Sequence, residues 1–298
     1  MKAPPLQRGD TIALVAPASW SDQFLTINAL LEERGYQVKL PSNQEGRFFY
    51  LAGSDQERAE ALMEAWKDPK VKAIWCIRGG YGSGRILDLL DYSWIKKHPK
   101  IFIGMSDITA LHGAFLKKTD LVTFLGPVAS WEAGADLWER LEGGKKGLCL
   151  NPNQPKALVP GKCVGKLVGG NLSLIASQIG TPWQLETKNK ILLLEDVNEK
   201  LFRIDRMLTQ LSQAGMVDEL SGLILASWKG CEGEEGDTIE RLCAQFFSSA
   251  PFPVLFGFPS GHIENQLTLP LNCLYELDAD ELRVTLLESG VEMAPERD

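Results

Sequence analysis

Short apolar runs alternate with segments of helical periodicity along the first half of the chain. Five runs predict buried strands, namely Thr11–Ala16, Gln37–Leu40, Val71–Ile77, Ile101–Gly104 and Val122–Leu125. Apolar residues recur at helical spacing between these runs, and the predicted helices are Leu25–Arg34, Gln56–Trp66, Arg85–Leu90 and Ile108–Phe115. Short strands that alternate with amphipathic helices indicate a parallel sheet covered on both faces.

The second half of the chain mixes helices and strands. The predicted helices there are Leu172–Ile179, Leu201–Leu211 and Thr238–Phe247. The predicted strands are Cys163–Val168, Ile191–Leu194, Leu220–Trp228, Val254–Phe258, Leu267–Leu269, Leu274–Leu277 and Leu282–Leu286. We expect the short strands at the end of the chain to pair antiparallel.

A stretch rich in Gly, Pro, Asn and Lys, residues 143–161, separates the two halves, and such a composition is typical of an interdomain connection. We therefore predict the fold class α/β, with an N-terminal parallel-sheet domain and a C-terminal mixed domain. The predicted domains are residues 1–145 and 163–298, and the predicted linker is residues 146–162.

The composition is that of an ordinary soluble protein, with 298 residues, 44% hydrophobic and 23% charged. A net charge of −8 disfavours nucleic acid and anionic membranes as partners. No apolar run approaches the ~20 residues of a membrane span. The six cysteines are scattered without a C-x-x-C pair, which is typical of reduced core cysteines. We expect a cytoplasmic protein without disulfides or a zinc cluster.

Ser106 lies on the predicted turn between the strand that ends at Gly104 and the helix that follows Asp107. Open α/β sheets place their sites at the carboxyl ends of strands, and a helix start leaves backbone N–H groups without partners. A hydroxyl beside such donors can serve acyl transfer, as a nucleophile next to an oxyanion hole. The alternative is that Ser106 caps the helix and Asp107 occupies its first turn.

A glycine-rich segment, Arg78–Arg85 with the sequence RGGYGSGR, directly follows the strand that ends at Ile77. Its glycines never give the spacing G-x-G-x-x-G, and it lacks the Lys-Ser/Thr ending of a P-loop. The segment can therefore be a loop that offers backbone N–H groups to an oxyanion, or a plain turn.

Only three histidines are present, so a general base can be sought by elimination. His98 lies in a polar loop, and His112 lies six residues beyond Ser106 on the same helix, where a structural hydrogen bond is expected. His262 follows Gly261 just past an apolar strand, which makes it the best-placed base. An exposed loop histidine is the alternative.

Two acids, Glu195 and Asp196, end the predicted strand Ile191–Leu194. An acid there can orient a histidine and stabilise its imidazolium form. The alternative for Asp196 is a cap of the following helix, with Glu199 completing a capping box. The residues Ser106, Glu195 and His262 can therefore form a triad, although sequence spacing alone does not show that they meet.

Several segments in order across nearly the whole chain match one family: RGGYGSGR, GMSDITA, FLGP, GGNL followed by IGTPW, LLLEDVNE with RIDRML, and GHIENQLTLPL. The chain thus resembles the LD-carboxypeptidases (muramoyltetrapeptide carboxypeptidases), a serine peptidase family that also includes microcin C self-immunity peptidases. The resemblance implies a Rossmann-like first domain and a mixed, largely β second domain. Met105 and Asn272 depart from the motifs of the family, the latter at a position where Gly is usual.

The resemblance also implies a role for several residues. Ser106 would be the nucleophile, Glu195 the triad acid and His262 the base, with the N–H groups of Gly80 and Asp107 as oxyanion donors. Glu199 is the alternative acid within the same motif. The substrate carboxylate would be bound by an arginine, for which the candidates are Arg78, Arg85 and Arg203.

The implied reaction is hydrolysis of the bond before the C-terminal D-alanine of murein tetrapeptides during peptidoglycan recycling, without a metal or organic cofactor. The family further suggests a homodimer. One alternative is a self-immunity peptidase that cleaves peptidyl- or aminoacyl-nucleotides, whose pocket needs an aromatic platform for the base. Trp131 and Trp138 are the candidates for that platform, but core or surface packing is the role we expect for both. An alternative of another class is a non-catalytic nucleotide-binding module built on the glycine-rich segment.

Overall fold

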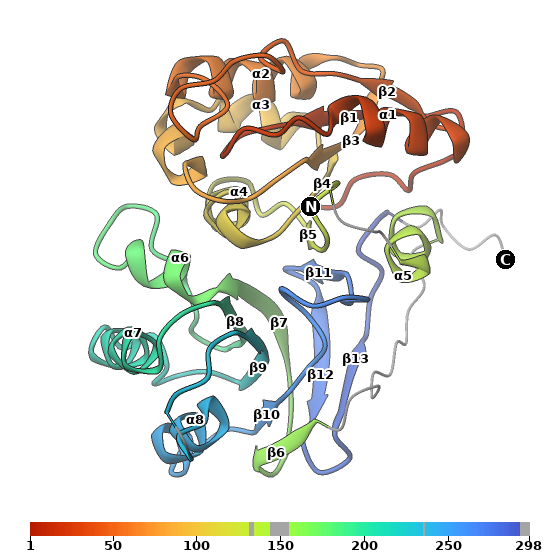
Figure 1. Cartoon of the computed structure of the whole chain (residues 1–298). Helices are drawn as coiled ribbons and strands as arrows, with labels where there is room; N and C mark the ends of the chain where they lie inside the picture. The colour runs from red at the N-terminus through yellow and green to blue at the C-terminus, as the bar shows by residue number, and fades with distance from the viewer. Residues whose placement is uncertain (131–133, 144–154, 235, 293–298) are drawn as a thin grey trace, which may run out of the picture. The chain divides into compact units, whose positions relative to one another are not determined.

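The computed structural model describes residues 1–130, 134–143, 155–234 and 236–292 (Figure 1). The chain divides into two compact units. The first unit comprises Met1–Lys145, Thr268–Pro270 and Ser289–Asp298, and the second comprises Lys146–Leu267 and Leu271–Glu288. The last part of the chain therefore returns twice to the first unit.

A six-stranded sheet in the order β11-β5-β4-β3-β1-β2 forms the centre of the first unit. Its strands are β1 (Thr11–Val15), β2 (Gln37–Lys39), β3 (Val71–Cys76), β4 (Ile101–Gly104), β5 (Thr123–Leu125) and β11 (Leu269–Leu271). The pairs from β2 to β5 are all parallel. The carboxyl ends of β1, β3 and β4 consequently lie side by side, at the edge where open α/β sheets place their sites.

Helical segments connect these strands. They are α1 (Phe24–Glu33), α2 (Asp55–Lys67), η1 (Ser83–Leu89), α3 (Tyr92–Lys97), η2 (Ser106–Ile108), α4 (Thr109–Thr119), α5 (Ala135–Trp138) and η3 (Glu139–Gly143). Helix α2 begins with a complete capping box, in which the Ser54 side chain and the Glu57 side chain each accept from the other's backbone N–H. Its apolar face buries Leu62 and Trp66 completely.

A seven-stranded sheet in the order β13-β12-β7-β8-β9-β10-β6 forms the second unit. Its strands are β6 (Lys156–Val159), β7 (Lys162–Asn171), β8 (Lys190–Val197), β9 (Gly222–Lys229), β10 (Val254–Phe256), β12 (Leu274–Asp278) and β13 (Arg283–Leu286). The central strands from β7 to β10 are parallel, whereas the outer pairs are antiparallel. Helices α6 (Leu172–Ser177), α7 (Leu201–Gln213) and α8 (Ile239–Phe247) connect the central strands.

The predicted fold class is confirmed, with a parallel-strand sheet in the first unit and a mixed sheet in the second. Asn272, which stands where the family usually has Gly, has a left-handed φ of 66°, and Asn tolerates this region better than most residues. Among the described residues, no helix is both long and apolar enough to cross a membrane.

The structure differs from the expectation at the predicted linker. Residues 146–154 of this linker lie outside the described residues, and Lys156–Val159 forms β6, which pairs antiparallel with β10. This strand is short and lies among Gly, Pro and Lys residues, so the local composition concealed it. The second sheet therefore begins inside the segment that the sequence indicated as a connection.

Candidate active site

Ser106 occupies a strained turn between β4 and α4. Met105 is fully extended, with φ −152° and ψ −176°, and Ser106 then adopts a left-handed φ of 63°. This region costs a residue other than glycine roughly 1–3 kcal/mol and is enriched at functional sites. A sharp, strained strand-to-helix turn that presents a half-buried serine is the geometry of a nucleophile elbow.

The alternative interpretation of Ser106 as a helix cap is wrong. The caps of η2 and α4 are Met105 and Ile108, and neither helix start has a side-chain cap hydrogen bond. Because Asp107 is the second residue of a 3₁₀ turn, its backbone N–H has no partner within that turn. The hydroxyl and this N–H therefore lie next to each other at the helix start.

The glycine-rich segment lies directly against Ser106. A Cβ atom on Gly79 would lie 2.9 Å from the Ser106 Cβ and 3.1 Å from its Oγ, so no side chain fits at this position. Gly80 follows with an exposed backbone and a φ of 92°. The structure thus places the two predicted oxyanion donors, Gly80 and Asp107, on the two segments that meet beside the serine.

Glu195 and His262 form a buried pair in the second unit. The Nδ1 atom of His262 lies 2.7 Å from Oε2 of Glu195, whose side chain is completely buried. Gly261 makes this approach possible, because its φ is 107° and a Cβ there would lie 2.6 Å from the same carboxylate oxygen. A carboxylate on Nδ1 leaves Nε2 as the nitrogen for proton exchange.

Asn171 is a further residue of this cluster, and its role was not predicted from the sequence. At the end of β7 it donates from Nδ2 to Glu195 Oε1 at 3.2 Å and to Asp196 Oδ1 at 3.0 Å. Its own Oδ1 accepts from the N–H of Leu174 at 3.2 Å and so caps α6. The signal in the sequence was an Asn directly before an apolar helix, within the GGNL motif.

The predicted capping role of Asp196 is wrong. Its carboxylate accepts from the N–H and the hydroxyl of Ser173 at 3.0 and 2.7 Å, so it stabilises the start of α6. The cap of the following helix, α7, is Lys200, which makes no side-chain cap hydrogen bond. Glu199 instead pairs with Arg203 at 3.5 Å on the exposed helix face. Glu195, and not Glu199, is therefore the acid that contacts the histidine.

His112 has the structural role that was expected. Its Nδ1 lies 2.8 Å from Thr123 Oγ1 and its Nε2 lies 2.9 Å from the carbonyl oxygen of Gly104. Burial lowers the pKa of this imidazole to about 4. His112 is therefore neutral at pH 7 and connects α4 to the ends of β4 and β5.

The three candidate arginines differ in how they are held. Arg85 donates from Nε and Nη2 to Asp55 Oδ2 at 3.1 and 2.9 Å, and Arg203 forms the exposed helical ion pair described above. Arg78 is exposed and donates from Nη1 to the carbonyl oxygen of Trp20 at 3.2 Å. It lies two residues before Gly80, in the glycine-rich segment.

Trp138, one of the two candidate platforms for a nucleobase, belongs to the core of the first unit. Its ring stacks on Tyr36 at 5.4 Å and meets Trp75 edge-on at 5.7 Å. Only 5% of its surface is exposed, so Trp138 has the packing role that was expected and is not a platform for a nucleobase. The other candidate, Trp131, lies outside the described residues.

Both halves of the chain match one family. The LD-carboxypeptidase N-terminal domain matches residues 12–126, and the LD-carboxypeptidase C-terminal domain matches residues 164–277. The chain belongs to the LD-carboxypeptidase family. The predicted class of enzyme, a serine carboxypeptidase, is thereby confirmed for this member of the family.

Similar proteins cover nearly the whole LD-carboxypeptidase chain. A probable murein peptide carboxypeptidase of Bacillus subtilis (strain 168) is 39% identical over 96% of this chain and 94% of that protein. The microcin C7 self-immunity protein MccF of Escherichia coli is 29% identical over 96% of this chain and 95% of that protein. The crystal structure of muramoyltetrapeptide carboxypeptidase from Oxalobacter formigenes is 29% identical, with a TM-score of 0.82, over 93% of this chain and 97% of that chain.

Proposed function

We propose that this LD-carboxypeptidase hydrolyses the amide before the C-terminal D-alanine of murein tetrapeptides, with Ser106, Glu195 and His262 as its catalytic triad. The observation that carries the proposal is the Glu195–His262 contact of 2.7 Å, formed by residues 67 positions apart. The strained Ser106 turn beside the glycine-rich segment supports the nucleophile. The names of the relatives in Bacillus subtilis and Oxalobacter formigenes support the substrate class.

In the proposed mechanism, Nε2 of His262 accepts the Ser106 hydroxyl proton as Oγ attacks the carbonyl carbon. Glu195 stabilises the resulting imidazolium through Nδ1. The N–H groups of Gly80 and Asp107 donate to the oxyanion of the tetrahedral intermediate.

The intermediate collapses when His262 returns the proton to the leaving amine, which releases D-alanine and leaves the peptide esterified to Ser106. A water molecule then attacks this ester while His262 accepts its proton. The second collapse restores the serine hydroxyl and releases the shortened peptide.

Arg78 is the proposed partner of the substrate carboxylate. Arg85 is engaged by Asp55, and Arg203 lies on the exposed face of α7. Arg78 remains exposed and belongs to the segment that holds the Gly80 donor. A guanidinium binds a carboxylate through two parallel N–H donors, which suits an enzyme that requires a free C-terminus.

The test is release of D-alanine from a murein tetrapeptide by purified enzyme and by single variants. From measured serine-protease triads, we expect kcat to fall about 10⁵- to 10⁶-fold in Ser106→Ala and His262→Ala, and about 10⁴-fold in Glu195→Gln. The matched controls are Ser93→Ala, Glu60→Gln and His98→Gln, which change exposed residues of the same types and should retain activity. Activity in folded Ser106→Ala close to the wild-type level would overturn the triad.

A second candidate substrate is a peptidyl- or aminoacyl-nucleotide, because the chain is 29% identical to a microcin C7 self-immunity protein. The same variants should be tested with an aspartyl-sulfamoyl-adenosine analogue. Cleavage of this analogue without D-alanine release would retain the triad and replace the substrate.

A further inference from the structure

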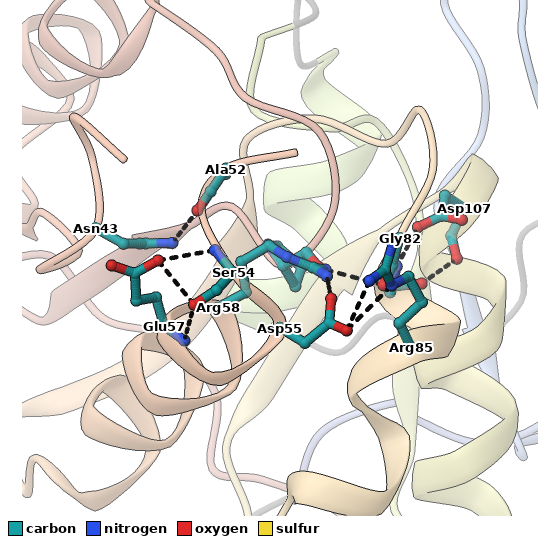
Figure 2. A network of polar contacts seen from close by, with 11 residues as sticks. Asn43, Ala52, Ser54, Asp55, Glu57, Arg58, Gly82, Arg85 and Asp107 are labelled. Carbon is teal, nitrogen blue, oxygen red and sulfur yellow. Dashed lines mark hydrogen bonds and ion pairs between the residues drawn. The ribbon is translucent and has the colours of Figure 1, made fainter. Parts of the chain in front are cut away.

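One peptide group of the glycine-rich segment, the group between Gly82 and Ser83, is hydrogen-bonded from both sides. Figure 2 shows Gly82 with its partner Arg58 and, nearby, Asp107. Its carbonyl oxygen accepts from Arg58 Nη1 at 2.8 Å, and its N–H donates to Asp107 Oδ2 at 2.7 Å. The Ser83 hydroxyl adds a bond of 2.6 Å to the backbone oxygen of Asp107. A buried guanidinium and a buried carboxyl group thus fix the plane of a single peptide.

Arg58 is unusual because it is a charged side chain that is only 1% exposed. A buried guanidinium is costly unless its donors are satisfied. Besides Gly82, it donates to the backbone oxygen of Pro17 and forms an ion pair with Asp55. The other oxygen of Asp55 accepts from Arg85, so one carboxylate at the start of α2 connects both arginines (Figure 2).

The bonded peptide lies between the two proposed oxyanion donors. Gly80 is two residues before Gly82, and Asp107, which accepts the Ser83 N–H, itself supplies the second donor and follows Ser106. Any rotation of the Gly82–Ser83 peptide would therefore displace the glycine-rich segment relative to the residue after the nucleophile.

We propose that Arg58 is a positioning residue that holds the oxyanion donors of Gly80 and Asp107 in register through the Gly82–Ser83 peptide. The proposal rests on the triad and oxyanion hole proposed above. Arg58 acts through the backbone and does not contact the substrate. It offsets the conformational freedom of a segment with four glycines, which on its own would sample many backbone states.

The experiment compares the wild type with Arg58→Met, which keeps an unbranched apolar stem and removes the guanidinium group with its charge and donors. The first readout is the rate of covalent labelling of Ser106 by a small fluorophosphonate, followed by intact mass, because this reaction uses the oxyanion hole without any peptide. The second readout is the division of the effect between kcat and KM with the tetrapeptide.

Complete loss of one oxyanion donor lowers kcat about 10²- to 10³-fold, so displacement of the donors should lower both the labelling rate and kcat about 10- to 100-fold. KM should change less than about threefold, since the ground state does not use these donors. Arg58→Lys retains the charge and should recover part of the loss. The control is Arg140→Met, which removes another buried arginine of the first unit and should retain the labelling rate.

A folded Arg58→Met enzyme, verified by near-UV circular dichroism, that is labelled within twofold of the wild-type rate would overturn the proposal. If Arg58→Met does not fold, Arg58→Gln decides, because it removes the charge and is too short to reach the Pro17 and Gly82 oxygens at once. Labelling of folded Arg58→Gln within twofold of the wild-type rate would overturn the proposal as well. Labelling of wild-type Ser106 without D-alanine release would reject the proposed substrate and leave the role of Arg58 intact. Failure to label Ser106 in the wild type would overturn both.

Discussion

His112 is predicted to make the first unit less stable as the pH falls from about 6.5 to 4. The imidazole is buried, and its two nitrogens contact Thr123 Oγ1 and the Gly104 carbonyl oxygen. Because Nε2 faces a carbonyl acceptor, it carries the proton, and Nδ1 accepts from the threonine hydroxyl. Desolvation lowers the pKa from 6.5 to about 4, because protonation in the folded state leaves a buried charge.

The sign of this stability change follows from the number of protons that the folded and the unfolded chain bind. Between pH 6.5 and 4 the unfolded chain binds a proton at this residue and the folded chain does not, so the free energy of unfolding decreases as the pH falls. The pKa of His112 differs by roughly 2.5 between the unfolded and the folded chain, which lowers the free energy of unfolding by about 3 kcal/mol over the whole pH range. Between pH 7.5 and pH 5, we expect His112 to lower the free energy of unfolding by about 2 kcal/mol.

The assay is urea unfolding of the wild type and of His112→Gln at pH 7.5 and pH 5, followed by tryptophan fluorescence. Glutamine can still donate to the Gly104 carbonyl oxygen but does not titrate. The decrease in unfolding free energy between the two pH values should be about 2 kcal/mol larger in the wild type than in the variant. Equal decreases would refute the reasoning, because all other titrating groups are shared by the two proteins.

Three further predictions follow from single contacts. Gly79→Ala should lower kcat/KM about 100-fold, since the new Cβ would lie 2.9 Å from the Ser106 Cβ and displace the serine. The assay is D-alanine release, and a melting curve of the same variant shows whether it is folded. Arg78→Met should raise KM for the tetrapeptide at least about tenfold with kcat nearly unchanged, and an unchanged KM would exclude this arginine as the carboxylate partner. Ser54→Ala removes the capping box of α2 and should lower the free energy of unfolding, measured by urea denaturation, by about 1 kcal/mol. The control Ser93→Ala, at the start of α3, should lower it by less.

The local features of the site could be predicted from the sequence. A short apolar run, a glycine and then a helical pattern place Ser106 at the end of a strand, and the scarcity of histidines directs attention to His262. The left-handed φ of Ser106 could not be read from the pattern, because serine seldom adopts it without surrounding structure to impose it.

The contacts between distant segments could not be predicted. The pairing of Glu195 with His262, which are 67 positions apart, depends on the path of the intervening chain. Arg58 lies in the sequence DQERAEALMEAWK, where a charged residue in the first turn of a helix is expected to face solvent, so nothing local indicated its burial. Asp196 was misassigned because its partner, Ser173, lies on a neighbouring element and not on the next helix in the chain.

The return of the chain to the first sheet has a consequence for how the protein is made. Strand β11 (Leu269–Leu271) is the edge neighbour of β5, and the N–H of Glu292 donates to the carbonyl oxygen of Ala3 at 2.8 Å. A nascent chain therefore cannot complete the sheet that carries Ser106 until its second half has been synthesised. Until then the edge of β5 is open to pairing with other chains, and a fragment ending at residue 145 would retain that liability permanently.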